Sequence, residues 1–448
     1  MRTRSLLLAG LLGIPAGPGC TEGAPTERPR NVLLITIDTL RSDHLGCYGG
    51  QVETPVVDAL AARGIRFTDV HTTAPTTLPA HTSILTGTWP SRHGVRLNGR
   101  HRASPSLRTL AEVLLERGYQ TGAFVSASVL DHFYGLDQGF SSFDDTMNQE
   151  VGLAQAQRRA SEVTDAALQW LSGVREPFLL WIHYFDPHGP YDPPPPFDGL
   201  YYKGRRDDPE NESMKGVPRV FYQKLDGITD VEYPRAQYKS EVAFVDASIG
   251  KLLSGLDAGG FSERTLIVVT ADHGESLGEV NYWFDHGLNL HDVCLRVPLI
   301  LSAPWLEGRR VVGGPASVVD IFPTILGTLG IDSPESDGID LLPASQHGPL
   351  PARVLFFETF LPTLTNRPPL YGLQSGCWKI TAAARSVALF DKTSDADDRV
   401  NLGHEQRAVL DELVRELENY LATATADVEE IAPSSEALEK LRALGYAK

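Results

Sequence analysis

The chain has 448 residues, of which 42% are hydrophobic and 22% are charged, as in ordinary globular proteins and unlike disordered ones. Its 57 acidic and 40 basic residues leave a net charge of −17, which argues against a nucleic acid as a structural partner. A small anionic substrate is not excluded, because a bound metal ion can reverse the field within a site.

Residues 1–20, "MRTRSLLLAGLLGIPAGPGC", have the form of a secretory signal. Two arginines precede an apolar stretch that is too short to span a bilayer, and small residues follow it. A cysteine at this point resembles a bacterial lipoprotein signal, with Cys20 lipidated, although Gly17 and Pro18 depart from the usual pattern. We therefore expect an exported protein, periplasmic or anchored to a bacterial membrane through Cys20. Residues 21–30 are predicted to form a tether.

Strand-like and helix-like patterns alternate after the tether. Continuous β-branched runs predict buried strands, and amphipathic patterns that end at glycine predict helices. This alternation predicts an α/β sandwich with a large, mostly parallel sheet. Residues 186–233, rich in Pro, Gly and charge, are predicted to form a long surface excursion near the site. The predicted strands are 31–38, 119–126, 177–185, 264–272 and 295–304, and the predicted helices are 54–64, 106–118, 151–171 and 235–256.

The pattern changes at about residue 350. Short strands and turns come first, and a charged helix over 404–421 follows. We therefore divide the chain into a catalytic domain, 31–349, and a smaller α+β subdomain, 350–448. Cys47, Cys294 and Cys377 are too widely spaced for a zinc pattern or a disulfide framework, and are expected to be buried or near-surface thiols, with one disulfide still open.

Two acidic residues follow predicted buried strands. Asp38 closes the first strand, and Asp272, followed directly by His273, closes "TLIVVTAD". Ligands of open α/β sheets gather beyond the carboxyl ends of their strands. A lone Asp there is usually a turn residue or a cap, but two of them with an adjacent histidine indicate a site.

The stretch "APTTLPAHTSILTG", residues 74–87, places Thr77 two residues before Pro79 at the start of a predicted helix. One interpretation is a helix N-cap, a position at which threonine is favoured. The other is a nucleophile aimed at an anion from a helix N-terminus.

Asp38, Thr77, Asp272 and His273 together offer hard oxygen ligands and one imidazole. This set suits a divalent ion such as Mn²⁺, Mg²⁺, Ca²⁺ or Zn²⁺, which would lower the pKa of the threonine hydroxyl. Histidines nearby in the sequence are candidate acids for the leaving group, namely His81, His188 and His286. Each is, taken singly, equally readable as a polar surface or core residue.

Several ordered segments make the chain resemble the sulfatase family of the alkaline phosphatase superfamily, over nearly the whole mature length. They are "NVLLITIDTLRSDHLGCYG", "TPVVDALAARGIRFTDVHTTAPTTLPAHTSILTG", "VTADHGE" and "RVPLILSAP", and the closing "GCWKI…ALFDKTSDADDRVNL" resembles the family's last subdomain.

The resemblance implies an α/β/α sandwich with a mixed sheet, a smaller C-terminal subdomain and one metal ion beside a nucleophile. Asp38, Asp272 and His273 would be metal ligands, Thr77 the nucleophile, and His188 and His286 contacts of the oxyanion or the leaving oxygen.

The chain departs from the family pattern at its signature. The usual Cys or Ser is Thr77 and the usual Arg is His81, so no formylglycine is expected. An esterified threonine must be released by attack at the central atom, which phosphorus tolerates better than sulfur. Thr39 stands where many relatives have another acid, and His273 stands where an Asn is frequent.

The sequence therefore predicts a hydrolase of small or polymeric anionic esters, with phosphate diesters or phosphonate esters favoured. The alternatives are a sulfuric ester hydrolase, a transferase that passes a phosphoryl group to an acceptor, and an inactive binding homologue. The retained metal-ligand set argues against the last of these.

Overall fold

The structure is a computed structural model, and it describes residues 31–147, 158–306, 310–345, 348–424 and 429–431. The predicted signal, Cys20 and the tether lie outside the described residues. Residues 151–157 of the predicted helix over 151–171 also lie outside them.

The main sheet of the described chain has eight strands in the order β11-β2-β10-β7-β1-β6-β4-β5. The pairings are parallel except those of β10, which runs antiparallel to both of its neighbours. This confirms the predicted α/β fold with a mixed, mostly parallel sheet. The strands are β1 (Asn31–Ile37), β2 (Ile65–His71), β4 (Gln120–Phe124), β5 (Ser142–Asp144), β6 (Phe178–Tyr184), β7 (Thr265–Ala271), β10 (Leu299–Ser302) and β11 (Arg310–Ser317).

The strands β2 and β11 are not predicted from the sequence. They lie at one side of the sheet, and their sequences, "IRFTDVH" and "RVVGGPAS", lack a long apolar run. Partly exposed strands alternate polar and apolar residues, so a search for continuous apolar runs does not find them.

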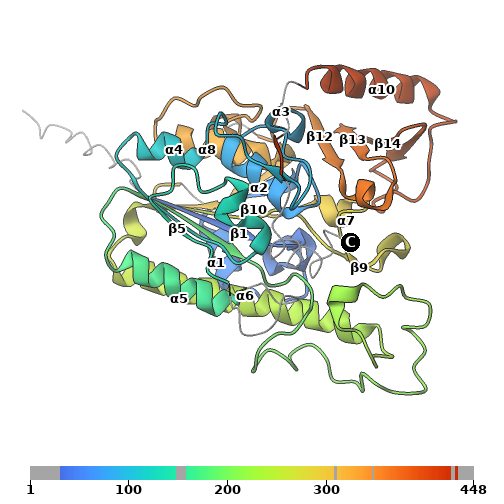
Figure 1. Cartoon of the computed structure of the whole chain (residues 1–448), viewed down its shortest axis with the longest axis horizontal. Coiled ribbons are helices and arrows are strands. Elements are labelled where there is room, and N and C mark those ends of the chain that lie inside the picture. The colour runs from blue at the N-terminus through green and yellow to red at the C-terminus, as the bar shows by residue number, and fades with distance from the viewer. Residues whose placement is uncertain (1–30, 148–157, 307–309, 346–347, 425–428, 432–448) are drawn as a thin grey trace, which may run out of the picture.

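Helices cover both faces of this sheet, with α5 and α6 on one side and α2, α4 and α8 on the other (Figure 1). The predicted helix over 106–118 is shorter in the structure, because Thr109 caps α4: the Thr109 hydroxyl accepts from the Glu112 amide at 3.1 Å. The helices are α1 (Pro55–Arg63), α2 (Thr77–Thr86), α3 (Pro90–His93), α4 (Leu110–Leu115), α5 (Ala160–Leu171), α6 (Glu232–Ala258), α7 (Asp292–Leu295), α8 (Ile321–Thr328) and α9 (Leu341–Ala344).

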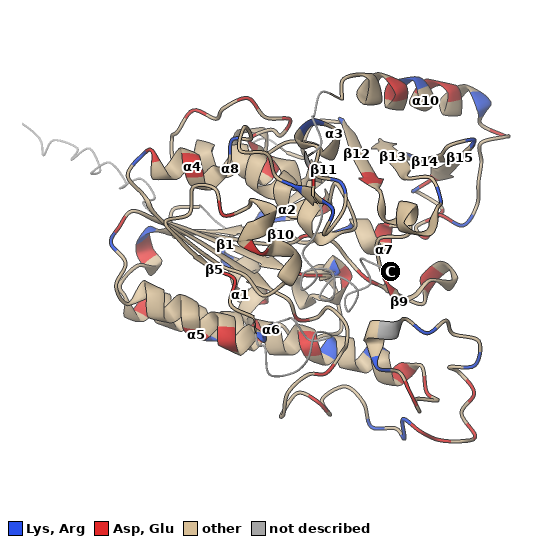
Figure 2. Cartoon of the chain, viewed as in Figure 1, with Lys and Arg blue, Asp and Glu red and all other residues tan. Residues whose placement is uncertain are grey.

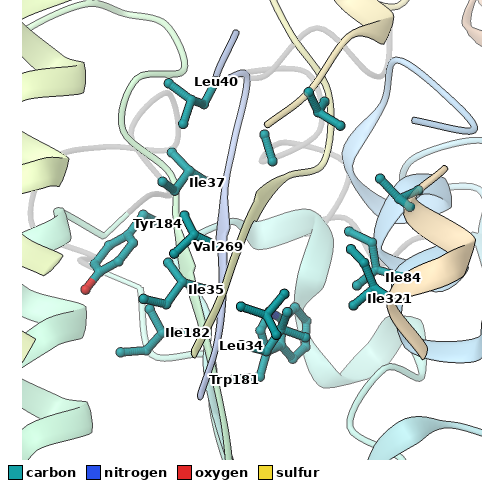
Figure 3. Close-up of a cluster of buried hydrophobic side chains, with 14 of the residues drawn as sticks. Leu34, Ile35, Ile37, Leu40, Ile84, Trp181, Ile182, Tyr184, Val269 and Ile321 are labelled. Carbon is teal, nitrogen blue, oxygen red and sulfur yellow. The ribbon is translucent and has the colours of Figure 1, made fainter. Parts of the chain in front are cut away.

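The central strand β1 is buried on both faces, which explains its continuous apolar sequence. In Figure 3, Ile35 and Ile37 point to one side of the sheet, and Leu34 points to the other, where Ile84 of α2 and Ile321 of α8 lie. The sheet is therefore a rigid platform that fixes the position of the residues directly after β1.

A second, four-stranded antiparallel sheet follows the main domain, with α10 (Arg407–Ala422) packed on it. Leu410, Leu413 and Leu417 of α10 recur at helical spacing and form an apolar cluster with this sheet. Its strands are β12 (Val354–Thr359), β13 (Leu370–Ser375), β14 (Trp378–Ala383) and β15 (Ser386–Asp391), and the remaining short strands are β3 (His101–Arg102), β8 (Ser276–Leu277), β9 (Trp283–Asp285) and β16 (Glu429–Glu430).

Other features of the described chain bear on the sequence predictions. None of its helices combines the length and the apolar composition needed to cross a bilayer. Cys47, Cys294 and Cys377 are free thiols, and Cys294 is buried. Acidic and basic residues are mixed along α10 and the 186–233 excursion (Figure 2).

Candidate active site

Asp38 and Asp272 lie side by side at one edge of the main sheet. β1 and β7 are parallel neighbours with Ile37 opposite Ala271, and each carboxylate comes directly after its strand. Because parallel strands end at the same edge, the register brings the two acids together. Both side chains are fully buried.

His273 joins these two carboxylates. Its Nε2 atom lies 3.6 Å from Asp38 Oδ1 and 3.4 Å from Asp272 Oδ2. The candidate ligand atoms of the three residues all lie within 4.8 Å of one another. The other Asp272 oxygen, Oδ1, accepts from the His273 amide at 2.7 Å and from the Thr39 amide at 3.2 Å, which holds Oδ2 toward the cluster.

The inward-facing atoms of this cluster lack hydrogen-bond partners among the described residues. They are both oxygens of Asp38, Oδ2 of Asp272 and Nε2 of His273. Burial raises the pKa of both aspartates and lowers the pKa of His273. Because unpaired buried charges are costly, such a set fits a bound divalent cation.

The tautomer of His273 agrees with metal binding. Its Nδ1–H donates to the Gly274 carbonyl at 3.0 Å, so Nε2 carries the lone pair that faces the aspartates. In metal sites, the ring nitrogen that does not bind the metal usually donates a hydrogen bond of this kind, which fixes the orientation of the ring.

Thr77 is the first residue of α2, and its side chain is buried. The N-cap position belongs to Thr76, whose side chain forms no capping hydrogen bond. The geometry therefore does not support the capping interpretation of Thr77. The Thr77 hydroxyl lies near Asp38, where it opposes the rise that burial causes in the pKa of that carboxyl, without a hydrogen bond of regular geometry.

His81 lies one turn further along α2, and both of its ring nitrogens are occupied. Nδ1–H donates to the Thr77 carbonyl at 2.8 Å, and Nε2 accepts from the Thr36 hydroxyl at 3.0 Å. Burial lowers the pKa of His81 to about 3. This neutral, fully bonded ring is suited to hold the start of α2 against β1, and not to donate protons.

His188 and His286 face each other beside the cluster, with ring centroids 5.0 Å apart, and the His286 ring is 4.5 Å from that of His273. Burial lowers the pKa of His188 to about 4. Burial also acts to lower the pKa of His286, but the Glu275 carboxylate at 3.3 Å and the charges of Asp285 and Asp38 together outweigh it, and the pKa of His286 is raised. One histidine is therefore neutral, and the other is poised to carry a proton.

Three polar residues at the site are not among the sequence predictions. His183 of β6 lies opposite Thr36 of β1, and its Nε2 is 3.5 Å from Asp38 Oδ2. Glu275 supports His286, and burial raises its pKa to about 7. Asn98 accepts from the Leu78 amide at 2.9 Å, and its Nδ2 has no partner among the described residues.

The sequence does carry signals for two of these residues. His183 is the one histidine in the apolar strand "FLLWIHY". Glu275 ends the motif "DHGE", directly beyond the predicted ligands. Asn98 lies in a loop with no comparable pattern.

A cavity of about 440 Å³ opens beside His286. Its walls include Tyr222 from the 186–233 excursion and Trp283 of β9. This agrees with the expectation that the excursion lies near the site.

Comparison with known proteins gives a consistent match. The family model described as Sulfatase matches residues 30–331. The chain is 26% identical over 350 residues to the uncharacterized sulfatase YidJ of Escherichia coli K12, covering 69% of each chain. It is 26% identical over 447 residues to the choline-sulfatase of Rhizobium meliloti strain 1021, covering 86% of this chain and 85% of that one.

Among solved structures, the phosphonate monoester hydrolase of Agrobacterium radiobacter has a similar fold. The TM-score is 0.72 at 22% identity, and the match covers 89% of this chain and 96% of that one.

Proposed function

This chain belongs to the sulfatase family, whose members are metal-dependent hydrolases of ester bonds, and within it we propose a hydrolase of phosphate diesters or phosphonate esters with Thr77 as nucleophile. The observation that carries the proposal is the position of Thr77: a buried hydroxyl at the start of α2, beside a carboxylate with unpaired oxygens.

Asp38, Asp272, His273 and the Thr77 hydroxyl would hold one divalent ion. When bound, the ion supplies positive charge that lowers the pKa of the hydroxyl and offsets the charge of the ester. His183 Nε2 lies 3.5 Å from Asp38 Oδ2, and its Nδ1 accepts from the Ser126 amide at 3.4 Å, so its Nε2–H faces that oxygen. We propose that His183 orients that carboxylate.

In the first half of the reaction, the deprotonated Thr77 oxygen would form a bond to phosphorus while the bond to the leaving oxygen breaks. His286, whose pKa is raised by Glu275, would protonate the leaving oxygen. In the second half, water would attack phosphorus, neutral His286 would accept its proton, and Thr77 would be released. The site thus returns to its starting protonation state.

The start of α2 offers fewer hydrogen-bond donors than a helix N-terminus usually does. The Leu78 amide already donates a hydrogen bond to Asn98 Oδ1, and Pro79 has no amide hydrogen. The buried Nδ2 of Asn98 is therefore the donor that we propose for an ester oxygen near Thr77. Few donors suit an ester with a single negative charge better than a dianion.

A sulfuric ester hydrolase is the second candidate, favoured by the similarity to a choline-sulfatase over most of both chains. Thr77 is the feature against it. A threonine ester cannot collapse by the elimination that the family's formylglycine permits, so release would require attack at sulfur itself.

A panel of four nitrophenyl esters tests the proposal: sulfate, phosphate monoester, phosphate diester and phosphonate monoester. Protein reconstituted with Mn²⁺, Mg²⁺, Ca²⁺ or Zn²⁺ should have its highest kcat/KM on the diester or the phosphonate. A highest kcat/KM on the sulfate would overturn the proposal and favour the second candidate.

A further inference from the structure

The cavity beside His286 is built from three distant parts of the chain. Tyr222 comes from the excursion, Trp283 and Leu288 from the segment around β9, and Leu361 and Leu364 from η11 (Leu361–Thr365). In Figure 1 the excursion, β9 and the C-terminal sheet lie around one region at the right of the molecule. The C-terminal subdomain therefore contributes to the wall of a cavity that touches a proposed catalytic residue.

The surface of this cavity is largely apolar and aromatic. Trp283, Leu288 and Leu364 are half-buried and packed against the main core, and Leu361 is 8% exposed. Tyr222 adds a second aromatic ring. Binding of an apolar ring against aromatic and leucine side chains is favourable, because it removes apolar surface of both partners from water.

Four polar side chains of the lining already form hydrogen bonds within the protein. The Tyr222 hydroxyl donates to Asp285 Oδ1 at 2.8 Å, and the Tyr282 hydroxyl donates to the His286 carbonyl at 2.6 Å. Asn281 accepts from the Trp283 indole at 3.0 Å, and the Thr365 hydroxyl donates to the Pro362 carbonyl at 2.9 Å.

Arg219, the cationic residue of the lining, is paired with Asp226. A sugar in this cavity would therefore lose water from its hydroxyls and find few free partners along the leucine and tryptophan part of the wall, and that exchange is unfavourable.

From these observations we propose that the cavity binds an aromatic group carried by the ester, next to His286. The inference rests on the proposed hydrolase function and adds its substrate class: anionic esters of aromatic alcohols, in preference to esters of sugars. Leu364 of η11 is then a specificity-determining residue supplied by the C-terminal subdomain.

Binding of non-hydrolysable phosphonates isolates the organic group, because the anion stays constant while turnover is not needed. Calorimetry on the metal-loaded protein would compare benzylphosphonate, methylphosphonate, butylphosphonate and a glucosyl phosphonate, each with its organic group joined to phosphorus through carbon. We expect benzylphosphonate to bind about tenfold or more tighter than methylphosphonate, the scale of discrimination in an apolar pocket.

Leu364→Asp should reduce the benzyl-to-methyl ratio to near one, and Leu364→Ala should reduce it in part. Leu115→Asp is the matched control, since Leu115 is 43% exposed on α4, away from the cavity lining, and it should leave the ratio unchanged. Tighter binding of the glucosyl or butyl compound, or a ratio that survives Leu364→Asp, would overturn the inference.

The outcome is separable from that of the proposed function. If the chain hydrolyses sulfate esters and not phosphorus esters, the same ratios measured with benzylsulfonate and methylsulfonate decide whether the cavity takes an aromatic group. If phosphorus esters are hydrolysed but the ratio is near one, the aromatic class alone is wrong.

Discussion

His273 Nε2 and Asp38 Oδ1 lie 3.6 Å apart, and neither atom has a hydrogen-bond partner within the described part of the chain. A direct hydrogen bond would bring them closer, and a separation of this size leaves room for an ion that both atoms contact at about 2.0–2.6 Å. The pair is therefore arranged for a shared metal ion.

The first prediction follows from this pair. Removing metal with a chelator should lower the Tm of the protein, and adding back Mn²⁺ should restore it. At a free-ion concentration of 100 times the Kd, the bound ion should add about 2.7 kcal/mol to the free energy of unfolding. Asp38→Asn should abolish the response, measured by thermal unfolding with and without metal.

Asp145→Asn is the control for that experiment. Asp145 belongs to a separate group of candidate ligands, with Asp131 and His132, whereas the remaining group, His81, His183 and Asp272, shares Asp272 with the site. The side chain of His132 is 67% exposed. The Tm response to metal should persist in this variant. If Asp145→Asn lost the response and Asp38→Asn kept it, the metal would bind at the surface group and not at Asp38.

The second prediction concerns Thr77. Thr77→Ala should remain folded and bind metal through the other ligands, while kcat falls by about a thousandfold or more, as when a nucleophile is removed. Thr77→Ser should keep part of the activity, because it retains the oxygen with a less restricted χ1.

Thr76→Ala is the matched control, since Thr76 precedes Thr77 and its side chain makes no capping bond. Its stability should fall by about 1 kcal/mol, as for a typical substitution at a buried position, and its turnover should be close to that of the unmodified protein. An alanine at position 77 that turned over substrate at the normal rate would contradict the mechanism.

The third prediction separates the roles of His286 and His81. His286→Asn should reduce kcat by about 10²–10⁴-fold for esters with a leaving-group pKa near that of simple alcohols, and far less for nitrophenyl esters, which leave without a proton. His81→Asn should reduce kcat by a similar factor for every leaving group, because His81 holds α2 and its nitrogens are both bonded. Equal leaving-group dependence in both variants would show that His286 does not donate the proton.

The fourth prediction concerns stability and pH, at a buried carboxyl pair away from the metal cluster. Burial, and then the Asp186 charge, raise the pKa of Glu241 well above its ordinary value. A carboxyl with a raised folded-state pKa binds more protons when folded. Its contribution to stability is therefore full below the unfolded pKa, about 4.3, and is lost as the pH rises toward the folded pKa.

Glu241→Gln mimics the protonated form of the carboxyl. In the unmodified protein, Glu241 Oε1 accepts from the Asp192 amide at 2.8 Å, and the glutamine side-chain oxygen can accept the same hydrogen bond. Denaturant unfolding should show this variant gaining stability relative to the unmodified protein between about pH 5 and pH 8, by about 1 kcal/mol or more. Glu412→Gln, on the exposed face of α10, should show no such trend.

Local sequence patterns determined the frame of this protein. The apolar run of β1 requires burial on both faces, so it predicts a central strand, and an acid directly after such a strand must lie at the sheet edge. For the same reason Asp38, Asp272 and His273 could be identified as a candidate cluster before the fold was known. The shape of the catalytic domain follows from the alternation of strands and helices.

Only the tertiary structure decided which side chains meet and in which state. His183 reaches Asp38 because β6 pairs with β1 in a register that places it opposite Thr36, 147 residues away in the chain. The His81 ring is hydrogen-bonded to Thr36, whereas the His286 ring lies beside the Glu275 carboxylate, which acts to raise the pKa of His286. Register, burial and charge partners come from contacts between distant segments, and a local pattern of residue types does not encode them.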